Sequence, residues 1–78
     1  MFAESIEYYR KCIQLNSRSA STYSALGLTY YLNYQVQEAV DCFNKALFLK
    51  SNDRLTNDLL YIALFEYSET MPLDELMD

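Results

Sequence analysis

The chain has 78 residues, 51% of them hydrophobic, with one glycine, one proline and a formal net charge of −5. This composition is too apolar for a disordered tail and too poor in turn residues for short strands, so it favours one helical domain. The negative charge disfavours nucleic acid and anionic membranes as partners. Because histidine is absent, the commonest general base and metal ligand are missing, and we expect no catalytic residue, metal or other cofactor.

The spacing of apolar side chains predicts a series of helices. Apolar residues recur three, four and seven positions apart over about 2–16, 20–32, 36–50 and 53–68. Ser19 and Asp53 are the predicted N-caps of the second and fourth helices, because their side chains can accept hydrogen bonds from first-turn amides. Asn33 or a neighbour must turn the chain after the second helix. For 70–78 we expect either an acidic C-terminal tail or a helical stub.

The first and third predicted helices repeat one another at a period of 34 residues. Shifting the chain by this period aligns 4–17 with 38–51. The aligned identical pairs are Glu4 with Glu38, Lys11 with Lys45, Leu15 with Leu49, and Ser17 with Ser51. Other pairs, such as Tyr9 with Phe43, keep their size and polarity, so the same helix face occurs twice.

A set of spaced residues follows the marker pattern of a known repeat family. In chain order the markers are Tyr23, Leu26, Gly27, Tyr30, Ala39, Phe43 and Ala46. In these markers and in its 34-residue period the chain resembles the tetratricopeptide repeat (TPR) family. The resemblance implies an all-α helix-turn-helix solenoid over 1–69. A complete repeat at 20–53 would follow the second helix of a preceding repeat at 2–16 and precede the first helix of a degenerate repeat at 53–68. Tyr34 stands where many TPRs have glycine in the turn.

The small residues among these packing markers have a physical reason. Gly27 and Ala39 lack the bulk that would keep two crossing helices apart. A glycine inside a helix costs about 1 kcal/mol relative to alanine, so Gly27 predicts a close approach that offsets this cost. Tyr23, Leu26 and Phe43 are expected to fill the space around that contact.

TPR solenoids bind extended peptides on the surface formed by the first helices of successive repeats. The resemblance therefore implies a peptide-binding face on the predicted helices 20–32 and 53–68, with a protein or extended peptide as partner. The candidate residues are Ser21, Ser24, Leu28, Tyr31, Leu55, Asp58 and Ile62. For Leu28, Leu55 and Ile62, packing against a neighbouring turn is an equally good interpretation.

The run 20–27, together with 39–41, Phe43, 46–47 and 52–53, resembles a more particular family. It is similar to the C-terminal repeats of the sixth subunit of the anaphase-promoting complex (cyclosome), a ubiquitin ligase. This resemblance implies a non-catalytic scaffold or adaptor in cell-cycle control, whose partners are a small stabilising subunit and other TPR subunits. Its location would be intracellular, in the cytoplasm or the nucleus. The alternative is a structural capping or self-association unit without a peptide ligand, which would form homo-oligomers through uncovered terminal helices.

The remaining reactive groups have structural interpretations. The two cysteines, Cys12 and Cys42, lie far apart and in no paired motif, so we expect buried thiols in a reducing compartment. Carboxylate pairs such as Glu4 and Glu7 lie on predicted exposed faces without a neighbouring nucleophile motif. We interpret them as solvated surface groups.

Overall fold

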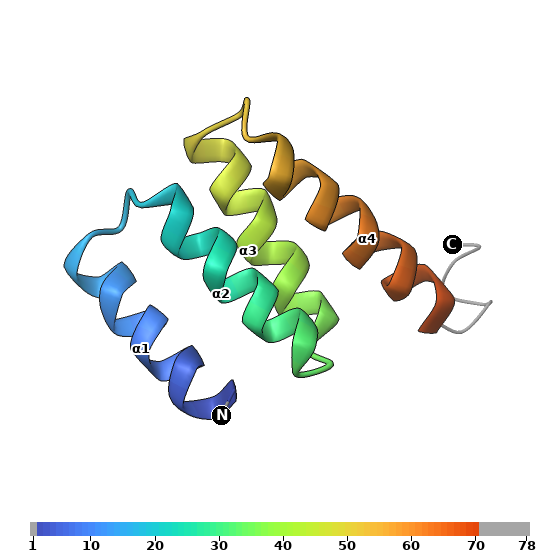
Figure 1. Cartoon of the computed structure of the whole chain (residues 1–78), viewed down its shortest axis with the longest axis horizontal. Coiled ribbons are helices and arrows are strands. Elements are labelled where there is room, and N and C mark those ends of the chain that lie inside the picture. The colour runs from blue at the N-terminus through green and yellow to red at the C-terminus, as the bar shows by residue number, and fades with distance from the viewer. Residues whose placement is uncertain (1, 71–78) are drawn as a thin grey trace.

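The computed structural model describes residues 2–70, with side chains up to Glu66. Its elements are α1 (Phe2–Leu15), α2 (Ala20–Leu32), α3 (Val36–Leu49) and α4 (Arg54–Thr70). Figure 1 shows α2 and α3 side by side at the centre, with α1 flanking α2 and α4 flanking α3. Over the described residues the fold is the all-α helical solenoid that the repeat pattern predicted. The expected tail or stub lies outside them, except for Thr70, which ends α4.

The N-terminal ends of α2 and α4 are capped in the same way, one repeat period apart. Ser19 Oγ accepts hydrogen bonds from the Thr22 amide at 3.3 Å and from the Thr22 hydroxyl at 2.8 Å. Asp53 accepts from the Thr56 amide at 3.5 Å and from the Thr56 hydroxyl at 2.7 Å. Both side chains satisfy amide groups that lack a partner within the helix, which confirms the predicted N-caps.

The turn between α2 and α3 places a tyrosine in the left-handed backbone region. Tyr34 has a φ of 64°, the one positive value recorded for a residue other than glycine in the described part of the chain. The sequence predicted that Asn33 or a neighbour turns the chain, and the neighbour Tyr34 takes this role, while Asn33 caps α2 with a φ of −92°. A left-handed conformation costs an L-residue roughly 1–2 kcal/mol, so the turn is strained at the site where many TPRs have glycine.

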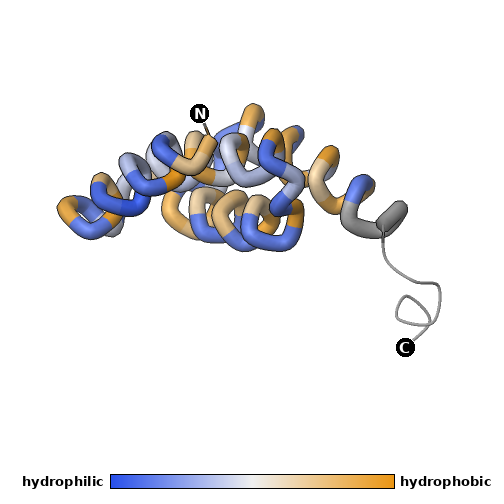
Figure 2. Tube along the Cα trace, turned by 90° about the horizontal axis from the view of Figure 1, so that it is seen from below, coloured by the Kyte–Doolittle hydropathy of each residue, from blue (hydrophilic) through white to orange (hydrophobic). Residues whose placement is uncertain are grey.

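The core lies between α2 and α3 and continues to α4. The fully buried apolar residues are Leu26, Gly27, Ala39, Phe43, Ala46 and Ala63. Gly27 touches the Phe43 ring, which is the close approach that a glycine inside a helix predicted. Tyr23 and Tyr30 are only half-buried, because a tyrosine ring can pack against the core while its hydroxyl remains near water. In Figure 2, hydrophilic and hydrophobic residues alternate around the helical coils, as they do in helices that bury one face.

The fourth helix is longer than its counterpart in the complete repeat. The end of α2 at Leu32 corresponds to Glu66, yet α4 continues to Thr70. Residues 67–69 correspond to the turn at 33–35 and are helical instead. The chain therefore does not turn where an exact repetition would turn it.

Both cysteines are free thiols and differ from expectation in their burial. Cys12 and Cys42 are half-buried rather than buried, which departs from the expectation of buried thiols. Half-burial follows from their place at the edge of the helix contacts, outside the cluster of Ala39, Phe43 and Ala63.

Candidate peptide-binding face

A hydroxyl relay links the first helices of successive repeats, α2 and α4. The Ser24 and Thr56 hydroxyl oxygens lie within hydrogen-bonding distance of each other. Because Thr56 donates its own hydrogen to Asp53 Oδ2, Ser24 is the donor in this pair. Thr56 is 1% exposed, so the central hydroxyl of the relay from Ser24 through Thr56 to Asp53 is shielded from water, whereas Ser24 and Asp53 are half-buried. The hydrogen bonds from Thr56 hold the pKa of the Asp53 carboxyl below its usual value.

A second hydrogen bond joins the two helices nearer the C-terminal end of α4. The Tyr31 hydroxyl on α2 donates to Glu66 Oε1 on α4 at 3.1 Å, and this bond is exposed. Partial desolvation and the bond to Glu66 together raise the pKa of Tyr31 above its ordinary value. The two links together fix the relative position of α2 and α4 at two points.

Apolar side chains of the same two helices remain open to solvent. The exposed fraction is 38% for Leu28 on α2, and 69% and 49% for Leu55 and Ile62 on α4. Exposed apolar surface of this kind is available for contact with another molecule. The packing interpretation of these three residues accounts for only part of their surface.

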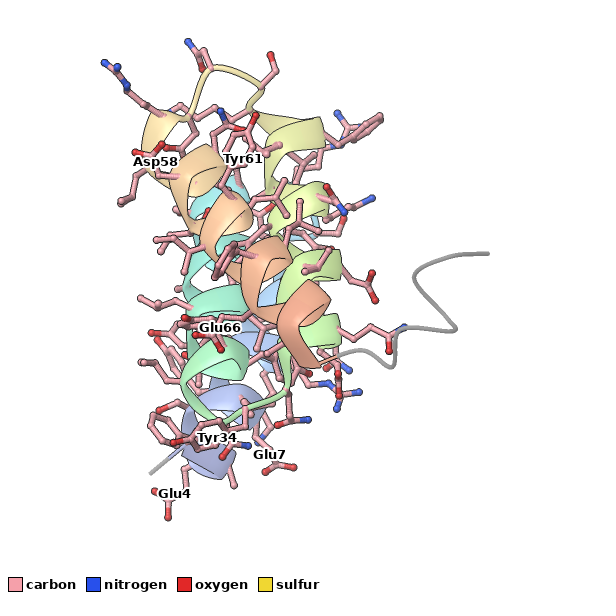
Figure 3. All side chains as sticks on the ribbon, turned by 90° about the vertical axis from the view of Figure 1, so that its right-hand side faces the viewer. Glu4, Glu7, Tyr34, Asp58, Tyr61 and Glu66 are labelled. Atoms are coloured by element: carbon pink, nitrogen blue, oxygen red, sulfur yellow. The ribbon has the colours of Figure 1, made fainter. Side chains whose placement is uncertain are left out.

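The polar candidate residues differ in whether their side chains already form hydrogen bonds within the protein. Ser24 is engaged by Thr56, so its hydroxyl is not open to a ligand in this arrangement. Ser21 is exposed and lies 3.3 Å from the hydroxyl of Ser19. Asp58 is exposed, and Figure 3 shows Asp58 and Glu66 on the side of α4 that is turned toward α2. The structure thus places the predicted residues Ser21, Ser24, Leu28, Tyr31, Leu55, Asp58 and Ile62 on two linked helices, which we call the first-helix face.

The sequence reasoning missed an apolar hollow that adjoins the first-helix face on α4. Its volume is about 600 Å³, and it is lined by Tyr61, Ile62, Leu64, Phe65 and Glu66. The exposed fractions of Tyr61 and Phe65 are 69% and 68%. The repeat register contained the signal, because Tyr61 and Leu64 correspond to Gly27 and Tyr30, which contact the second helix of their own repeat. Without such a helix in the described structure, these side chains face outward.

The first-helix face presents apolar surface, hydroxyl groups and negative charge. Within residues 2–70, no cluster of three or more metal-ligating side chains is placed to hold an ion. In the same part of the chain, no helix has the length and apolar character needed to cross a membrane.

Comparison with known proteins gives the same family as the repeat markers. The chain is 38% identical over 63 residues, which are 81% of its length, to Anaphase-promoting complex subunit 6 of Dictyostelium discoideum, of which it covers 7%. The same identity over the same length relates it to Anaphase-promoting complex subunit 6 of Arabidopsis thaliana, of which it covers 12%. It is 37% identical over 59 residues, or 76% of its length, to the Cell division cycle protein 16 homolog of Homo sapiens, covering 10% of that protein.

The chain therefore spans only 7–12% of the length of these relatives. The family model for the tetratricopeptide repeat matches residues 1–19 and 20–53. These matches cover more than half of the chain and contain all seven packing markers. With its paired helices and its repeat register, the chain belongs to the tetratricopeptide repeat family.

Proposed function

We propose that the chain is a non-catalytic interaction segment of a TPR scaffold or adaptor, and that its first-helix face binds an extended peptide of a partner protein. The observation that carries this proposal is the linked pair α2 and α4. The bonds of Ser24 to Thr56 and of Tyr31 to Glu66 hold the two helices in place, so a partner would meet a pre-organised surface. The exposed Leu55 and its apolar neighbours would supply contact area.

The similarity to Anaphase-promoting complex subunit 6 supports a finer proposal. In it, the scaffold belongs to a ubiquitin ligase complex of the anaphase-promoting type and acts in cell-cycle control. Its partners would be a small stabilising subunit and other TPR subunits, and its location would be the cytoplasm or the nucleus. The free thiols of Cys12 and Cys42 are compatible with such a reducing compartment.

The test is an affinity pull-down with quantitative mass spectrometry. The wild-type chain would be compared with Tyr31→Ala and Asp58→Lys on the first-helix face, and with Asp41→Lys as a matched charge reversal on the exposed side of α3. We expect both first-helix variants to lose the same partners while Asp41→Lys keeps them. Recovery of anaphase-promoting complex subunits among the lost partners would support the finer proposal. A profile that is equal for all the variants would contradict peptide binding at this face.

A second function is favoured by the apolar hollow on α4. Tyr61, Leu64 and Phe65 expose a continuous apolar surface, which fits a structural unit that stacks on another copy or caps a superhelix. Sedimentation equilibrium of the wild type and of Phe65→Asp separates the two functions. Association that depends on concentration and is abolished by Phe65→Asp would support the structural unit. A monomer up to high concentration would contradict it and would leave peptide binding unaffected.

A further inference from the structure

Five of the six basic residues of this acidic chain lie toward one end of the molecule, and the sixth, Arg10, lines another hollow with Gln35 and Glu38. Because successive helices are antiparallel, the α1–α2 loop and the α3–α4 loop lie at the same end (Figure 1). The basic residues at or near these loops are Lys11, Arg18, Lys45, Lys50 and Arg54. The acidic residues nearer the opposite end are Glu4, Glu7, Glu38, Asp41 and Glu66, and Figure 3 shows the first two at the same end of the molecule as Tyr34 of the α2–α3 turn. Asp53 and Asp58 lie toward the basic end, and Asp53 is engaged as the N-cap of α4.

A hollow at this end combines positive charge with an exposed aromatic ring. Its volume is about 390 Å³, and its lining consists of Ser17, Arg18, Tyr23, Lys45, Phe48 and Leu49. The lining therefore contains two cations and no carboxylate. Phe48 is 81% exposed, and the Lys45 ammonium lies 5.4 Å from the centre of its ring. We call this feature the basic-end hollow.

The combination restricts the class of ligand. A bare inorganic anion could pair with Arg18 and Lys45 but would leave the Phe48 ring in water. A purely apolar segment would cover Phe48 but would remove water from two cations without replacing their partners, which costs free energy. A peptide that carries an apolar side chain between carboxylates satisfies both parts of the hollow.

We propose that the basic-end hollow binds an acidic segment of a partner protein. An apolar side chain of that segment packs on Phe48 and Leu49, and flanking carboxylates pair with Arg18 and Lys45. Charge complementarity is the basis for choosing this occupant, since the lining is positive although the whole chain has a net charge of −5. The guanidinium of Arg18 can hold a carboxylate through two parallel hydrogen bonds, which adds orientation to attraction. This surface is formed by α3, Tyr23 and the α1–α2 loop, so it is separate from the first-helix face.

The test uses the complete chain and a fluorescein-labelled hexapeptide of sequence Asp-Glu-Leu-Phe-Asp-Glu, followed by fluorescence anisotropy. Two matched probes each remove one feature: Asn-Gln-Leu-Phe-Asn-Gln lacks the charges, and Asp-Glu-Ser-Ser-Asp-Glu lacks the apolar centre. We expect saturable binding of the first probe that weakens as salt is raised, and at least about tenfold weaker binding of both others.

Substitutions in the chain show where the acidic probe binds. Arg18→Glu, Lys45→Glu and Phe48→Ser should each weaken binding at least about tenfold, whereas Lys50→Glu, a charge reversal outside the hollow, should change it less than about threefold. Arg18, Lys45 and Phe48 are exposed, so circular dichroism should show that the variants keep the helix content of the wild type. If a charge reversal prevents folding, Arg18→Gln or Lys45→Gln takes its place.

Three outcomes would overturn the proposal. The first is no binding of the acidic probe at millimolar concentration, and the second is equal binding by all the variants. The third is dimerisation of the chain that the probe reverses, because the occupant would then be a second copy rather than a partner protein.

Discussion

Gly27 on α2 lies so close to Phe43 on α3 that a Cβ atom at Gly27 would be 2.6 Å from Phe43 Cε1 and 2.8 Å from Cδ1. Phe43 is 1% exposed, so its ring is enclosed by other atoms of the protein. We expect Gly27→Ala to destabilise the fold, because overpacking costs about 1–3 kcal/mol and outweighs the gain of about 1 kcal/mol in helix propensity. Urea unfolding followed by circular dichroism measures the difference.

A double-mutant cycle isolates this contact. Phe43→Leu opens space beside position 27, so adding Gly27→Ala to it should cost less than adding it to the wild type, by about 1 kcal/mol or more. Equal costs in the two backgrounds would show that the ring does not set the need for glycine.

The strained turn predicts a stabilising substitution at Tyr34. Its φ of 64° favours glycine, and its side chain is 92% exposed, so little packing is lost on replacement. Tyr34→Gly should raise the free energy of unfolding by about 0.5–1 kcal/mol after the greater chain entropy of glycine is subtracted. Tyr34→Ala is the control, because alanine has the same left-handed penalty as tyrosine. If alanine and glycine gave the same gain, backbone strain would not be its cause.

The shielded relay predicts a loss of stability when the Thr56 hydroxyl is removed. Thr56→Val keeps the shape of the side chain but leaves Ser24 without its acceptor, and the expected loss is about 1–3 kcal/mol. Thr56→Ser keeps the hydroxyl and should lose only about 1 kcal/mol for the missing methyl group. Thermal unfolding of both variants is the measurement. The interpretation fails if serine is at least as damaging as valine.

Stability should depend on pH through Asp53. The folded-state pKa of this carboxyl is lowered, first by the Thr56 hydroxyl bond, so its contribution is present above the unfolded pKa of about 3.9 and is lost as pH falls through the folded value. Unfolding of the wild type and of Asp53→Asn, compared between pH 7 and pH 2, should show a difference that is constant above pH 5 and shrinks below about pH 4. A difference that stays constant down to pH 2 would exclude this coupling.

Cys42 should react slowly with thiol reagents. Burial, with smaller contributions from Asp41 and Glu38, raises the pKa of the Cys42 thiol to about 11. Its thiolate fraction at pH 8 is then on the order of 100-fold below that of an ordinary cysteine, and its rate of reaction with a disulfide reagent should fall accordingly. Cys12→Ser isolates the Cys42 reaction in the folded chain, and the same variant in urea supplies the unprotected rate. Similar rates in both conditions would contradict the shift.

The repeat architecture could be predicted from the sequence because helix periodicity determines which residues are buried. The spacing of Ala39 and Phe43 on one face, and the need of Gly27 for a close neighbour, are local facts that the fold preserves. The length of α4 was also encoded, since no glycine or proline lies between Arg54 and Thr70 to end the helix. The predicted end at about residue 68 lies two residues before the observed end at Thr70.

Other features could not be predicted because they depend on how helices are placed in space. Ser24 and Thr56 are 32 positions apart, and only the angle between α2 and α4 decides whether their hydroxyls meet. The hollow beside Phe48 likewise depends on how the α1–α2 loop approaches α3. In the turn, the left-handed conformation falls on Tyr34 because α2 ends at Leu32 and Asn33 caps it. The general preference of asparagine for this conformation does not decide the position. The use of the first-helix residues in binding stays a prediction.

The unequal links between α2 and α4 have a mechanical consequence. The bond near the start of α4 is shielded, whereas the Tyr31 to Glu66 bond near its end can exchange with water at little cost. If Thr56 serves as the pivot for a tilt of α4, Glu66 lies about 15 Å along the helix from it. A tilt of about 8° around this pivot would displace Glu66 by about 2 Å, enough to break or remake its bond to Tyr31. Under the proposed peptide binding, the outer link would open to a bound chain while the link at Thr56 keeps the two helices in place.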